Sequence, residues 1–487
     1  MIPVKRKTKI IATLGPAVAS PEAIGRLVDA GMDVARLNFS HGTRETHGQW
    51  LAWVRAAAEE RGRAVAVLQD IQGPRIRVGT FPGGKVELRT GGRVTLIDGD
   101  GEGGAHRVFV RHLAAAGLSR GDRVLLADGL IEVRVTRRLA GGVSAVVEQG
   151  GMLTDHKGAA FPGAHLDLPA VTDKDRADLA YGRRIGVDLV AASFVVSADD
   201  IAAVRAVAGG VPVVAKIERA AALGNLPAIL AAADGAMVAR GDLGVEIGYE
   251  PLPRIQKEII AATNAVGGIS ITATEMLESM IASPRPTRAE VTDVANAVMD
   301  GSDAVMLSAE TAVGAYPVRA VEAMAAICLE AEAGPSLARA PELVGAPGSF
   351  ASAIARATAE AADGLGLATV VAFTDSGATA RLVSKYRPGA GILALTPRPE
   401  TYRRMAVLWG VTPVSVPRRS STDEMIDTAE EVLLERGLAA RGDRVAIAAG
   451  VPPNQDAATN LLKLHTVGER SPGMSRPGRP ARKPRSS

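Results

Sequence analysis

Eight short apolar runs between residues 9 and 307 constrain the fold of this 487-residue chain more than any other feature. The runs are rich in Val, Ile and Ala, as expected of parallel strands that are buried on both faces. Helix-like segments follow most of them, and eight strand–helix units predict a TIM (β/α)8 barrel. A doubly wound open sheet is the alternative, but polar residues at the ends of most strands favour closure. The predicted strands are Lys9–Thr13, Asp33–Phe39, Ala64–Gln69, Asp188–Phe194, Val211–Ile217, Gly235–Ala239, Ile269–Thr274 and Asp303–Leu307. The predicted helices are Pro21–Ala30, Arg44–Arg61, Ser197–Ala208, Ala220–Ala232, Pro253–Val266, Arg288–Met299 and Pro317–Glu332.

The segment between the third and fourth strands is far too long for an ordinary loop of a barrel. It is rich in Gly and in short strand-like runs, so we expect an inserted all-β domain, a β-barrel lid, over residues 74–170. The barrel itself would then comprise residues 1–73 and 171–343. An insert at this point lies at the catalytic end of a barrel, where a lid is useful. Its predicted strands are Lys85–Leu88, Arg93–Asp98, Arg107–Val110, Arg123–Ala127, Ile131–Arg137 and Val143–Val147.

A second α/β unit is predicted over residues 349–468, with strands at Thr369–Phe373, Gly391–Leu395, Val411–Val416 and Arg444–Ala449. The loop after its first strand contains Thr374, Ser376, Gly377 and Thr379 and opens a helix. Hydroxyls, a glycine and a helix N-terminus suit a phosphate, but such turns are equally common as plain helix caps.

Residues 469–487 form a basic tail in which Pro, Gly and Ser abound, and we expect it to be disordered. Six Lys and Arg residues of this tail account for the positive balance, since the formal net charge falls from +3 to −3 without them. The simplest interpretation is a solvated tail, and we do not expect it to bind nucleic acid. Measuring nucleic-acid affinity with and without the tail would test that expectation.

Composition excludes several classes of protein. The chain has no apolar run of the length needed to cross a membrane, and its charged N-terminus has no secretory h-region. Cys328 is the single cysteine, so an intrachain disulfide is impossible, which fits a reducing compartment. We therefore expect a cytoplasmic protein with no membrane association.

Polar residues follow the apolar runs at the carboxyl end of nearly every predicted strand. One such residue is usually a cap or a structural ion pair, but a set gathered at one end of a barrel is typical of an active site. The set comprises Arg36, Asn38, Ser40, His41, Asp70, Arg75, Arg77, Ser193, Lys216, Glu218, Arg240, Asp242, Thr272, Thr274, Ser308 and Glu310.

The charges in this set predict chemistry on a phosphorylated anion. Glu218 and Asp242 are suited to a divalent metal, Mg²⁺ or Mn²⁺, with open positions left for substrate and water. Lys216 is a compact cation in an apolar strand and could neutralise a phosphoryl group in flight. The backbone N–H groups of Gly241 and Asp242, where a turn enters a helix, could hold a carboxylate.

Other members of the set predict phosphate binding and proton transfer. Arg36 and Arg77 can clamp phosphate oxygens. Thr274, Ser308 and Glu310 could carry a proton through water. The sequence contains neither a Walker A motif nor a kinase-type Gly-rich loop, which excludes those two phosphoryl-transfer architectures.

At these residues the chain resembles the pyruvate kinase family, over residues 4–468. The resemblance rests on TKIIATLGPA (8–17), GMDVARLNFSHG (31–42), DIQGPRIRVGT (70–80), AKIE (215–218), DGAMVARGDLGVEI (234–247), the block from Thr272 to Thr311 and TNLLKLHTVG (459–468). It implies transfer of a phosphoryl group from phosphoenolpyruvate to ADP, giving pyruvate and ATP, and a homotetramer. The family pattern implies Mg²⁺ ligation by Glu218 and Asp242, and substrate contacts from Arg36, Lys216, Gly241, Asp242 and Thr274. It implies catalytic roles for Arg36, Arg77, Lys216, Thr274, Ser308 and Glu310. It assigns the nucleotide contacts to Thr13, Pro16, Asn38, His41, Arg77 and Lys157.

Three departures from the family pattern bear on cation use and regulation. The monovalent-cation site maps to Asn38, Ser40, Asp70 and the carbonyl of Ile71, yet residue 75 is Arg where K⁺-dependent members have Glu. A fixed guanidinium there can supply the charge of K⁺, so we expect no K⁺ requirement. Glu275 replaces the usual Gln, which has no firm explanation.

The third departure is the turn from Pro452 to Ala457, which replaces a Gly/Ser-rich loop used for sugar bisphosphates, and its Asp456 would repel a phosphate. Together with a resemblance to the bacterial group activated by AMP or sugar monophosphates, this favours AMP or ribose 5-phosphate as effector. The contacts would come from Thr374, Ser376, Gly377 and Thr379.

Two alternatives come from different classes. The first is another enzyme of the phosphoenolpyruvate/pyruvate barrel group, such as a lyase or a phosphotransferase with a phosphohistidine. Those chemistries need a different set of residues, and the phosphohistidine enzymes need a swivelling His domain, which the sequence does not contain. His41 more simply orders phosphate ligands. A non-catalytic regulatory relative would have lost Lys216, Glu218, Asp242 or Thr274, and all four are present.

Overall fold

The computed structural model describes residues 6–164, 166, 168–334, 348–453 and 457–469. The basic tail from residue 470 and Asp456 of the C-terminal turn lie outside this range, as does the segment 335–347. In the part of the chain described, no helix has the length and apolar character needed to span a membrane.

Eight parallel strands close into a barrel, which confirms the predicted fold. The strands follow one another around the barrel in chain order, and the last pairs with the first. All their residues are buried except Asn38, which is half-buried at the end of its strand. The strands are β1 (Lys9–Thr13), β2 (Val34–Asn38), β3 (Ala66–Asp70), β12 (Leu189–Ala192), β13 (Val213–Ile217), β14 (Gly235–Ala239), β15 (Ile269–Ala273) and β16 (Ala304–Leu307).

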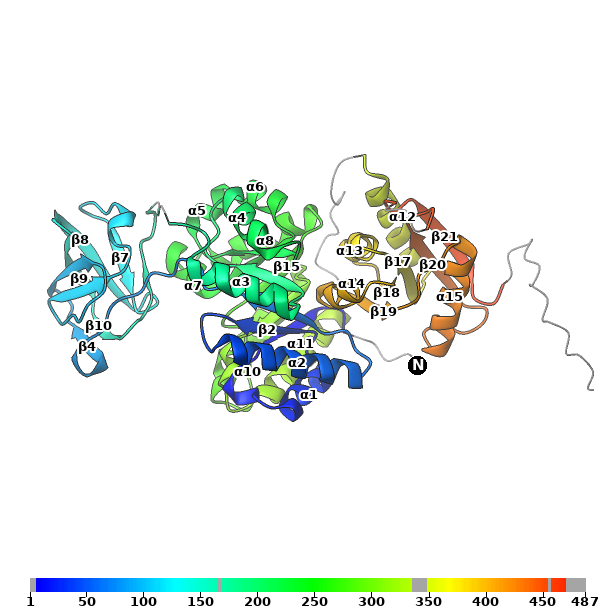
Figure 1. Ribbon diagram of the computed structural model, residues 1–487, viewed down its shortest axis with the longest axis horizontal. Coiled ribbons are helices and arrows are strands. Elements are labelled where there is room, and N and C mark those ends of the chain that lie inside the picture. The colour runs from blue at the N-terminus through cyan, green and yellow to red at the C-terminus, as the bar shows by residue number, and fades with distance from the viewer. Residues whose placement is uncertain (1–5, 165, 167, 335–347, 454–456, 470–487) are drawn as a thin grey trace, which may run out of the picture.

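Helices surround the barrel (Figure 1). They are α1 (Pro21–Ala30), α2 (Arg44–Glu60), α3 (Asp173–Ile185), α4 (Ala198–Ala208), α5 (Ala220–Gly224), α6 (Leu226–Ala232), α7 (Arg240–Ile247), α8 (Leu252–Ala265), α9 (Arg288–Met299), α10 (Ala309–Ala312) and α11 (Pro317–Ala333). Short 3-10 turns add η1 (Pro16–Val18) and η4 (Glu278–Ile281).

The helices differ from the sequence prediction in two respects. The predicted helix Ala220–Ala232 is broken at Asn225, because Pro227 in the first turn of α6 has no N–H to continue the preceding helix. Helices α3 and α10 were not predicted, although Thr172 and Asp175 form a capping box at the start of α3 that marks it in the sequence. Of α7, only its start near Gly241 was expected.

The insert is all-β, as predicted, but its strands pair as two sheets rather than one closed barrel. One sheet has six strands in the order β11-β7-β8-β9-β5-β6, and the other pairs β10 with β4. The sheets separate because β9 ends at Gln149, and after Gly150 the chain pairs with β4 instead. The strands are β4 (Lys85–Leu88), β5 (Arg93–Asp98), β6 (Arg107–Val110), β7 (Arg123–Leu126), β8 (Ile131–Leu139), β9 (Gly142–Gln149), β10 (Gly151–Thr154) and β11 (Ala159–Ala160), with 3-10 turns η2 (Pro82–Gly84) and η3 (Ala114–Ala116).

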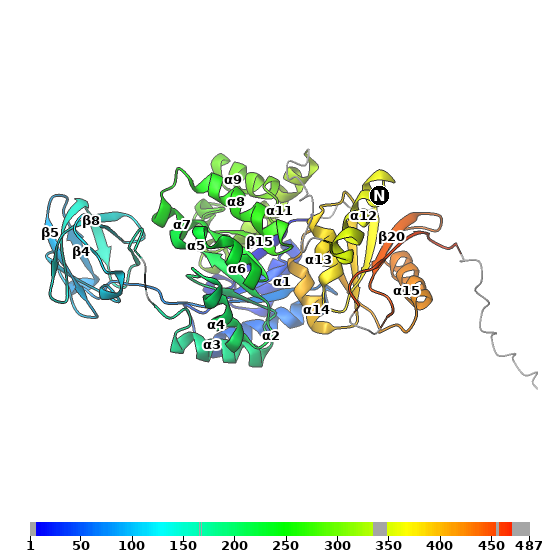
Figure 2. The same ribbon diagram turned by 90° about the horizontal axis from the view of Figure 1, so that it is seen from above.

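The C-terminal unit is a five-stranded sheet in the order β19-β18-β17-β20-β21. Four strands are parallel, and the unpredicted β21 adds antiparallel to β20 at the edge. Its elements are α12 (Phe350–Gly364), β17 (Thr369–Phe373), α13 (Ala378–Lys385), β18 (Gly391–Thr396), α14 (Pro399–Arg404), η5 (Met405–Val407), β19 (Val411–Ser415), α15 (Thr422–Glu435), β20 (Arg444–Ala449) and β21 (Leu461–Thr466). Figures 1 and 2 show the insert and this unit at opposite ends of the barrel.

A repeated aspartate closes the amino-terminal end of the barrel. Asp33, Asp188, Asp234 and Asp303 each immediately precede an even-numbered strand of the barrel. In every case Oδ2 accepts a hydrogen bond from a backbone N–H at or next to the start of the preceding strand, at 2.8–2.9 Å. Each carboxylate therefore satisfies a donor at a strand end that would otherwise be buried without a partner.

Two of these aspartates, Asp188 and Asp303, also anchor the C-terminal unit. Asp188 forms an ion pair with Arg403 of α14 at 2.8 Å, and Asp303 pairs with Lys385 at the end of α13 and with Arg387 at 2.9 Å. Asp303 and Lys385 are both fully buried. The C-terminal unit thus docks on the end of the barrel that is opposite to the insert.

Candidate active site

A cavity of about 360 Å³ opens at the carboxyl ends of the barrel strands. Met237 and Met306 of the strands contribute its apolar lining. The predicted site residues that line it are Thr13, Arg36, Asn38, Ser40, His41, Arg75, Ser193, Lys216, Glu218, Asp242, Thr274 and Ser308. The predicted residues Pro16, Asp70, Ile71, Arg77, Lys157, Gly241 and Glu310 are not part of its lining.

Lys216 is the centre of a buried ion-pair cluster. Its Nζ lies 2.7 Å from Glu218 Oε1 and 3.2 Å from Asp70 Oδ1, and it donates to Ser193 Oγ at 2.7 Å. Burial disfavours the charged form, but the two carboxylates outweigh burial and raise the pKa of Lys216. The side chain is therefore an ammonium at neutral pH, held at the wall of the cavity.

Arg36 is fixed by the same cluster. Its Nε donates to Asp70 Oδ2 at 2.8 Å, and its Nη1 donates to Thr13 Oγ1 at 3.0 Å. Burial would raise the pKa of Asp70, but Lys216 and Arg36 together hold that pKa below its usual range. Asp70 thus lies beneath two cations and sets the orientation of both.

Glu218 and Asp242 are the two carboxylates that face the cavity. Oε2 of Glu218 accepts a hydrogen bond from the N–H of Phe194 at 2.7 Å, and the positive φ of 58° at Phe194 belongs to the backbone that presents this N–H. The pKa of Glu218 is raised, first by burial and then by the negative charge of Asp242, against the attraction of Lys216. Sequence patterns did not point to Phe194, since its contribution is made by the backbone.

This pair of carboxylates fits a hard divalent cation. Carboxylate oxygens are the preferred protein ligands of Mg²⁺, and a cation between them relieves their repulsion. Across the described ranges, no group of three or more His, Cys, Asp or Glu side chains is arranged to hold a metal ion. A cation at this point would therefore keep several positions for substrate and water, as Mg²⁺ usually does.

Thr274 lies at the end of β15 in a strained conformation. Thr274 and Glu275 have φ values of 66° and 54°, and a positive φ is rare for a β-branched residue. The hydroxyl of Thr274 donates to the carbonyl of Ala273 at 2.7 Å and accepts from the N–H of Gly241 at 2.8 Å. A hydroxyl has two acceptor positions, so one remains for a further partner.

Glu310 binds backbone N–H groups next to the cavity-lining residue Ser308. It is fully buried and accepts hydrogen bonds from the N–H groups of Leu277 and Ser308, at 3.1 and 2.6 Å. Burial raises the pKa of Glu310 in spite of these donors. The hydroxyl of Ser308 is buried and has no hydrogen-bond partner among the described residues, so it is available to a ligand in the cavity.

His41 lines the cavity mouth as a neutral imidazole. Burial, followed by the charges of Arg77, Arg75 and Arg36, lowers its pKa. His47, which sequence reasoning did not single out, bonds to the carbonyl of His41 at 2.9 Å through its Nε2.

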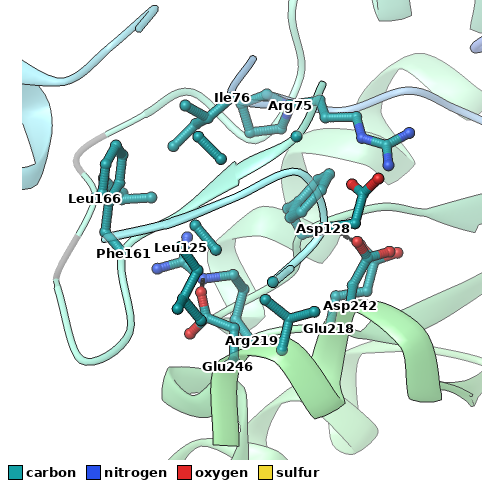
Figure 3. Close-up of a pocket in the computed structure, with 17 residues that line it drawn as sticks. Arg75, Ile76, Leu125, Asp128, Phe161, Leu166, Glu218, Arg219, Asp242 and Glu246 are labelled. Atoms are coloured by element: carbon teal, nitrogen blue, oxygen red, sulfur yellow. Dashed lines mark hydrogen bonds and ion pairs between the residues drawn. The ribbon is translucent and has the colours of Figure 1, made fainter. Parts of the chain in front are cut away.

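The insert contributes residues that lie outside the main cavity. Arg77 donates to the carbonyl of His156 at 2.9 Å, and Lys157 is half-exposed, with its Nζ 3.3 Å from Asp128. A small cavity of about 60 Å³ lies between insert and barrel. Figure 3 shows Arg75 and Ile76 on one side of it, and Arg219 and Glu246 on the other.

Three of the four residues predicted to bind a monovalent cation have partners for their oxygens within the protein. Asn38 Oδ1 accepts from the N–H of Ser40, and the carbonyl of Ile71 accepts from Ser193 Oγ at 2.8 Å. Asp70 contacts two cations, as described above. Ser40 and Arg75 line the same cavity.

A separate cavity of about 420 Å³ lies in the C-terminal unit. Thr374, Ser376 and Thr379 line it, while Gly377 caps α13 and donates its N–H to Thr374 Oγ1 at 2.8 Å. Arg398, Arg418 and Arg419 also line it and were not predicted, although Arg418 and Arg419 lie shortly after the end of β19 at Ser415. Cations beside hydroxyls make this cavity suitable for an anion.

Comparisons with known proteins agree on one family. A model of the pyruvate kinase barrel domain matches residues 5–321, and a model of the pyruvate kinase alpha/beta domain matches residues 352–465. The chain is 44% identical over 478 residues to a pyruvate kinase of Geobacillus stearothermophilus, a match covering 96% of this chain and 81% of that protein. Pyruvate kinases of Sporosarcina psychrophila and of Staphylococcus aureus are 41% and 42% identical, with 95% of this chain and 81% of each relative covered.

Proposed function

Because the chain belongs to the pyruvate kinase family, an enzyme family that converts phosphoenolpyruvate and ADP to pyruvate and ATP in glycolysis, we propose that its barrel mouth is the catalytic site. We further propose that the reaction needs a divalent cation, proceeds without K⁺ and responds to a phosphorylated effector. The observation that carries the proposal is the cluster of Lys216, Glu218 and Asp242 around a single cavity.

Glu218 and Asp242 would hold Mg²⁺ or Mn²⁺, which supplies positive charge to the substrate oxygens. Asp242 lines this cavity at the start of α7, and its backbone N–H suits the substrate carboxylate, whereas the N–H of the preceding Gly241 donates to Thr274 Oγ1. Lys216 and Arg36 bring two more positive charges to the transferring phosphoryl group. Their ion pairs with Asp70 hold them in place, so little reorganisation accompanies the reaction.

The insert would supply the remaining nucleotide contacts. Arg77 and Lys157 belong to adjoining segments of the insert, since Arg77 bridges to Gly158. Closure of the insert on the barrel would bring both toward the phosphates of ADP. Thr13, Asn38 and His41 line the cavity mouth beneath them, while Pro16 lies in η1 beyond the end of β1.

Loss of the phosphoryl group leaves an enolate of pyruvate, which takes a proton at its methylene carbon. Thr274 and Ser308 present hydroxyls to the cavity, and Glu310 accepts from the N–H of Ser308. We propose that these three residues deliver the proton through water.

A coupled assay of pyruvate formation tests this function directly. The chain should form pyruvate from phosphoenolpyruvate, ADP and Mg²⁺, and Asp242→Asn should raise the Mg²⁺ concentration for half-maximal rate by about tenfold or more. Glu246→Gln is the matched control, because Glu246 lies one helical turn further along α7 and pairs with Arg219. Absence of pyruvate formation by the intact chain would refute the proposal.

Independence of K⁺ is supported by the charges around Asp70. Lys216 and Arg36 already balance this carboxylate, and Arg75 adds a third positive charge at the cavity. The rate in K⁺-free buffer should equal the rate in KCl, whereas Arg75→Glu should create activation by K⁺. A many-fold activation of the unaltered chain by KCl would contradict this part of the proposal.

The C-terminal cavity is proposed as the effector site, with AMP or ribose 5-phosphate favoured over a sugar bisphosphate. Thr374, Ser376 and the N-terminus of α13 at Gly377 would bind one phosphate, and Thr379 lies beside them. Arg419 has a buried Nε without a hydrogen-bond partner among the described residues. Saturation curves for phosphoenolpyruvate should shift to lower concentration with the effector, and Arg419→Gln should abolish the shift without changing the rate in its absence.

We also propose a cytoplasmic homotetramer, by analogy with the family. Light scattering coupled to size exclusion measures the assembly directly. A monomer at assay concentration would overturn this proposal without affecting the catalytic one.

A further inference from the structure

Arg240 is a buried arginine at the first turn of α7, and its contacts converge on the strained end of β15. Its Nε and Nη2 donate to the carbonyl of Thr274 at 3.1 and 2.8 Å, and Nη2 also donates to the carbonyl of Glu275 at 3.1 Å. The residue is 6% exposed and is not part of the cavity lining. It therefore acts on any ligand only through the residues that it holds.

The carbonyls that Arg240 binds belong to the two residues with positive φ. A left-handed conformation at Thr274 and Glu275 persists only where surrounding contacts impose it. The planar guanidinium donates in a fixed fork to two successive carbonyls, an arrangement that an ammonium cannot reproduce. Arg240 thus stabilises the unfavourable backbone conformation of Thr274 and Glu275.

Asp293 completes the arrangement from α9. Its Oδ1 lies 2.6 Å from Nη1 of Arg240, on the edge of the guanidinium that does not bind the turn. The Asp293 side chain is 34% exposed, so it can be changed with little disturbance of the core. One carboxylate on a neighbouring helix thereby fixes the rotation of the guanidinium.

Gly241, the residue after Arg240, also links the start of α7 to Thr274. The N–H of Gly241 donates to the hydroxyl of Thr274 at 2.8 Å, while the side chain of Arg240 binds the Thr274 carbonyl. The start of α7 and the end of β15 are therefore tied twice, by backbone and by side chain. This fixes the distance between the start of α7, where the N–H of Asp242 suits a carboxylate, and the hydroxyl proposed to act at the methylene carbon.

We propose that Arg240, oriented by Asp293, is the positioning residue that sets Thr274 for proton delivery to the substrate carbon; this rests on the role given to Thr274 above. The proposal assigns Arg240 no contact with substrate. It predicts that weakening the Arg240 contacts slows the proton-transfer step more than it weakens substrate binding.

Exchange of the methyl protons of pyruvate with D₂O isolates this step, since it needs enolisation but no net phosphoryl transfer. The exchange is followed by proton NMR with the full-length enzyme, Mg²⁺ and ATP. Arg240→Lys should lower the exchange rate by about tenfold or more, because a small displacement of a reacting group has large effects on rate. The KM for phosphoenolpyruvate should change by less than about threefold.

Arg205→Lys is the matched control. Arg205 also binds a backbone carbonyl, that of Ala232 at 2.8 Å, and an aspartate, Asp234 at 2.6 Å, but at the opposite end of the barrel. The control should leave the exchange rate within about twofold. An equal loss of exchange in both variants would show a merely structural effect and overturn the proposal.

Two further variants separate this proposal from the proposed function. Asp293→Asn should reduce exchange by about threefold, and it decides the question should Arg240→Lys fail to fold. Thr274→Val should abolish most of the exchange. Normal exchange by Thr274→Val refutes the role given to Thr274. If Thr274→Val loses exchange while Arg240→Lys or Asp293→Asn exchanges normally, the positioning role of Arg240 alone is overturned.

Discussion

The two ends of the barrel contain similar ion-pair clusters in different surroundings. At the carboxyl end, Lys216 contacts Asp70 and Glu218 beside a cavity of about 360 Å³. At the amino-terminal end, Lys385 contacts Asp303, and both side chains are fully buried. The chemistry of the groups is the same, so what distinguishes a candidate site from a structural clamp is the adjoining space for a ligand.

The two lysines also differ in the balance of charge. At Lys385 burial is the largest effect and lowers the pKa to about 8. Asp303 opposes this shift, but it shares its carboxylate with Arg387, whose positive charge lowers the pKa of Lys385 further. At Lys216 two carboxylates outweigh burial and raise the pKa. The carboxyl end therefore favours the charged form of its lysine, whereas burial at the amino-terminal end disfavours it.

The largest expected effect is on stability at the amino-terminal end. Asp303→Asn leaves Lys385 and Arg387 without their carboxylate and should lower the free energy of unfolding by about 3–5 kcal/mol. Urea denaturation at neutral pH measures this loss. Asp234→Asn is the matched control. Asp234 accepts the same kind of backbone hydrogen bond, but it pairs with a single arginine, Arg205, and its side chain is 28% exposed. Its cost should be about 1 kcal/mol, and equal losses in the two variants would contradict the account.

The next largest effect is on catalysis at the carboxyl end. Lys216→Met keeps the length of the side chain but removes the charge that faces the cavity, so kcat should fall about 10²–10³-fold. The rate of pyruvate formation at saturating substrate measures this fall. A kcat within a few-fold of the unaltered chain would remove Lys216 from the proposed chemistry.

A smaller effect concerns pH and Lys9, at the amino-terminal end of β1. Burial lowers the pKa of Lys9 to about 8, and its Nζ donates to the carbonyl of Val411 at 2.8 Å. Between pH 8 and the ordinary lysine pKa of about 10.4, the unfolded chain binds the proton that the folded chain has lost. Stability should therefore rise with pH in this window, by about 1 kcal/mol per unit at most from this group.

Lys9→Met should remove that part of the rise. Urea denaturation across the window, for both proteins, gives the two slopes. Parallel curves would show that Lys9 keeps an ordinary pKa in the folded protein.

The barrel and the polar residues at its carboxyl end were predictable from the sequence, because buried parallel strands appear as apolar runs that end in polar residues. The eight runs predicted the barrel, and the residues at their ends include Lys216, Glu218 and Asp242, which the fold brings to one cavity. Contributions made by backbone or by distant partners left no such pattern. The N–H of Phe194, the support of Thr274 by Arg240 and the clamp between Asp303 and Lys385 depend on tertiary contacts.

The pairing of strands within the insert could not be predicted from the sequence either. Its strands were predicted individually, but their division into two sheets depends on how the chain turns at Gly150 after β9. Short alternating runs fix which face of a strand is buried, and they do not fix which strand it pairs with.

The measurement that tests the comparison most directly is kcat for pyruvate formation by Asp303→Asn, at a temperature where this variant is folded. If the amino-terminal end serves stability alone, kcat should lie within about twofold of the unaltered chain, while Lys216→Met loses about a hundredfold or more under the same conditions. A loss in Asp303→Asn as large as that in Lys216→Met would contradict the separation of the two ends.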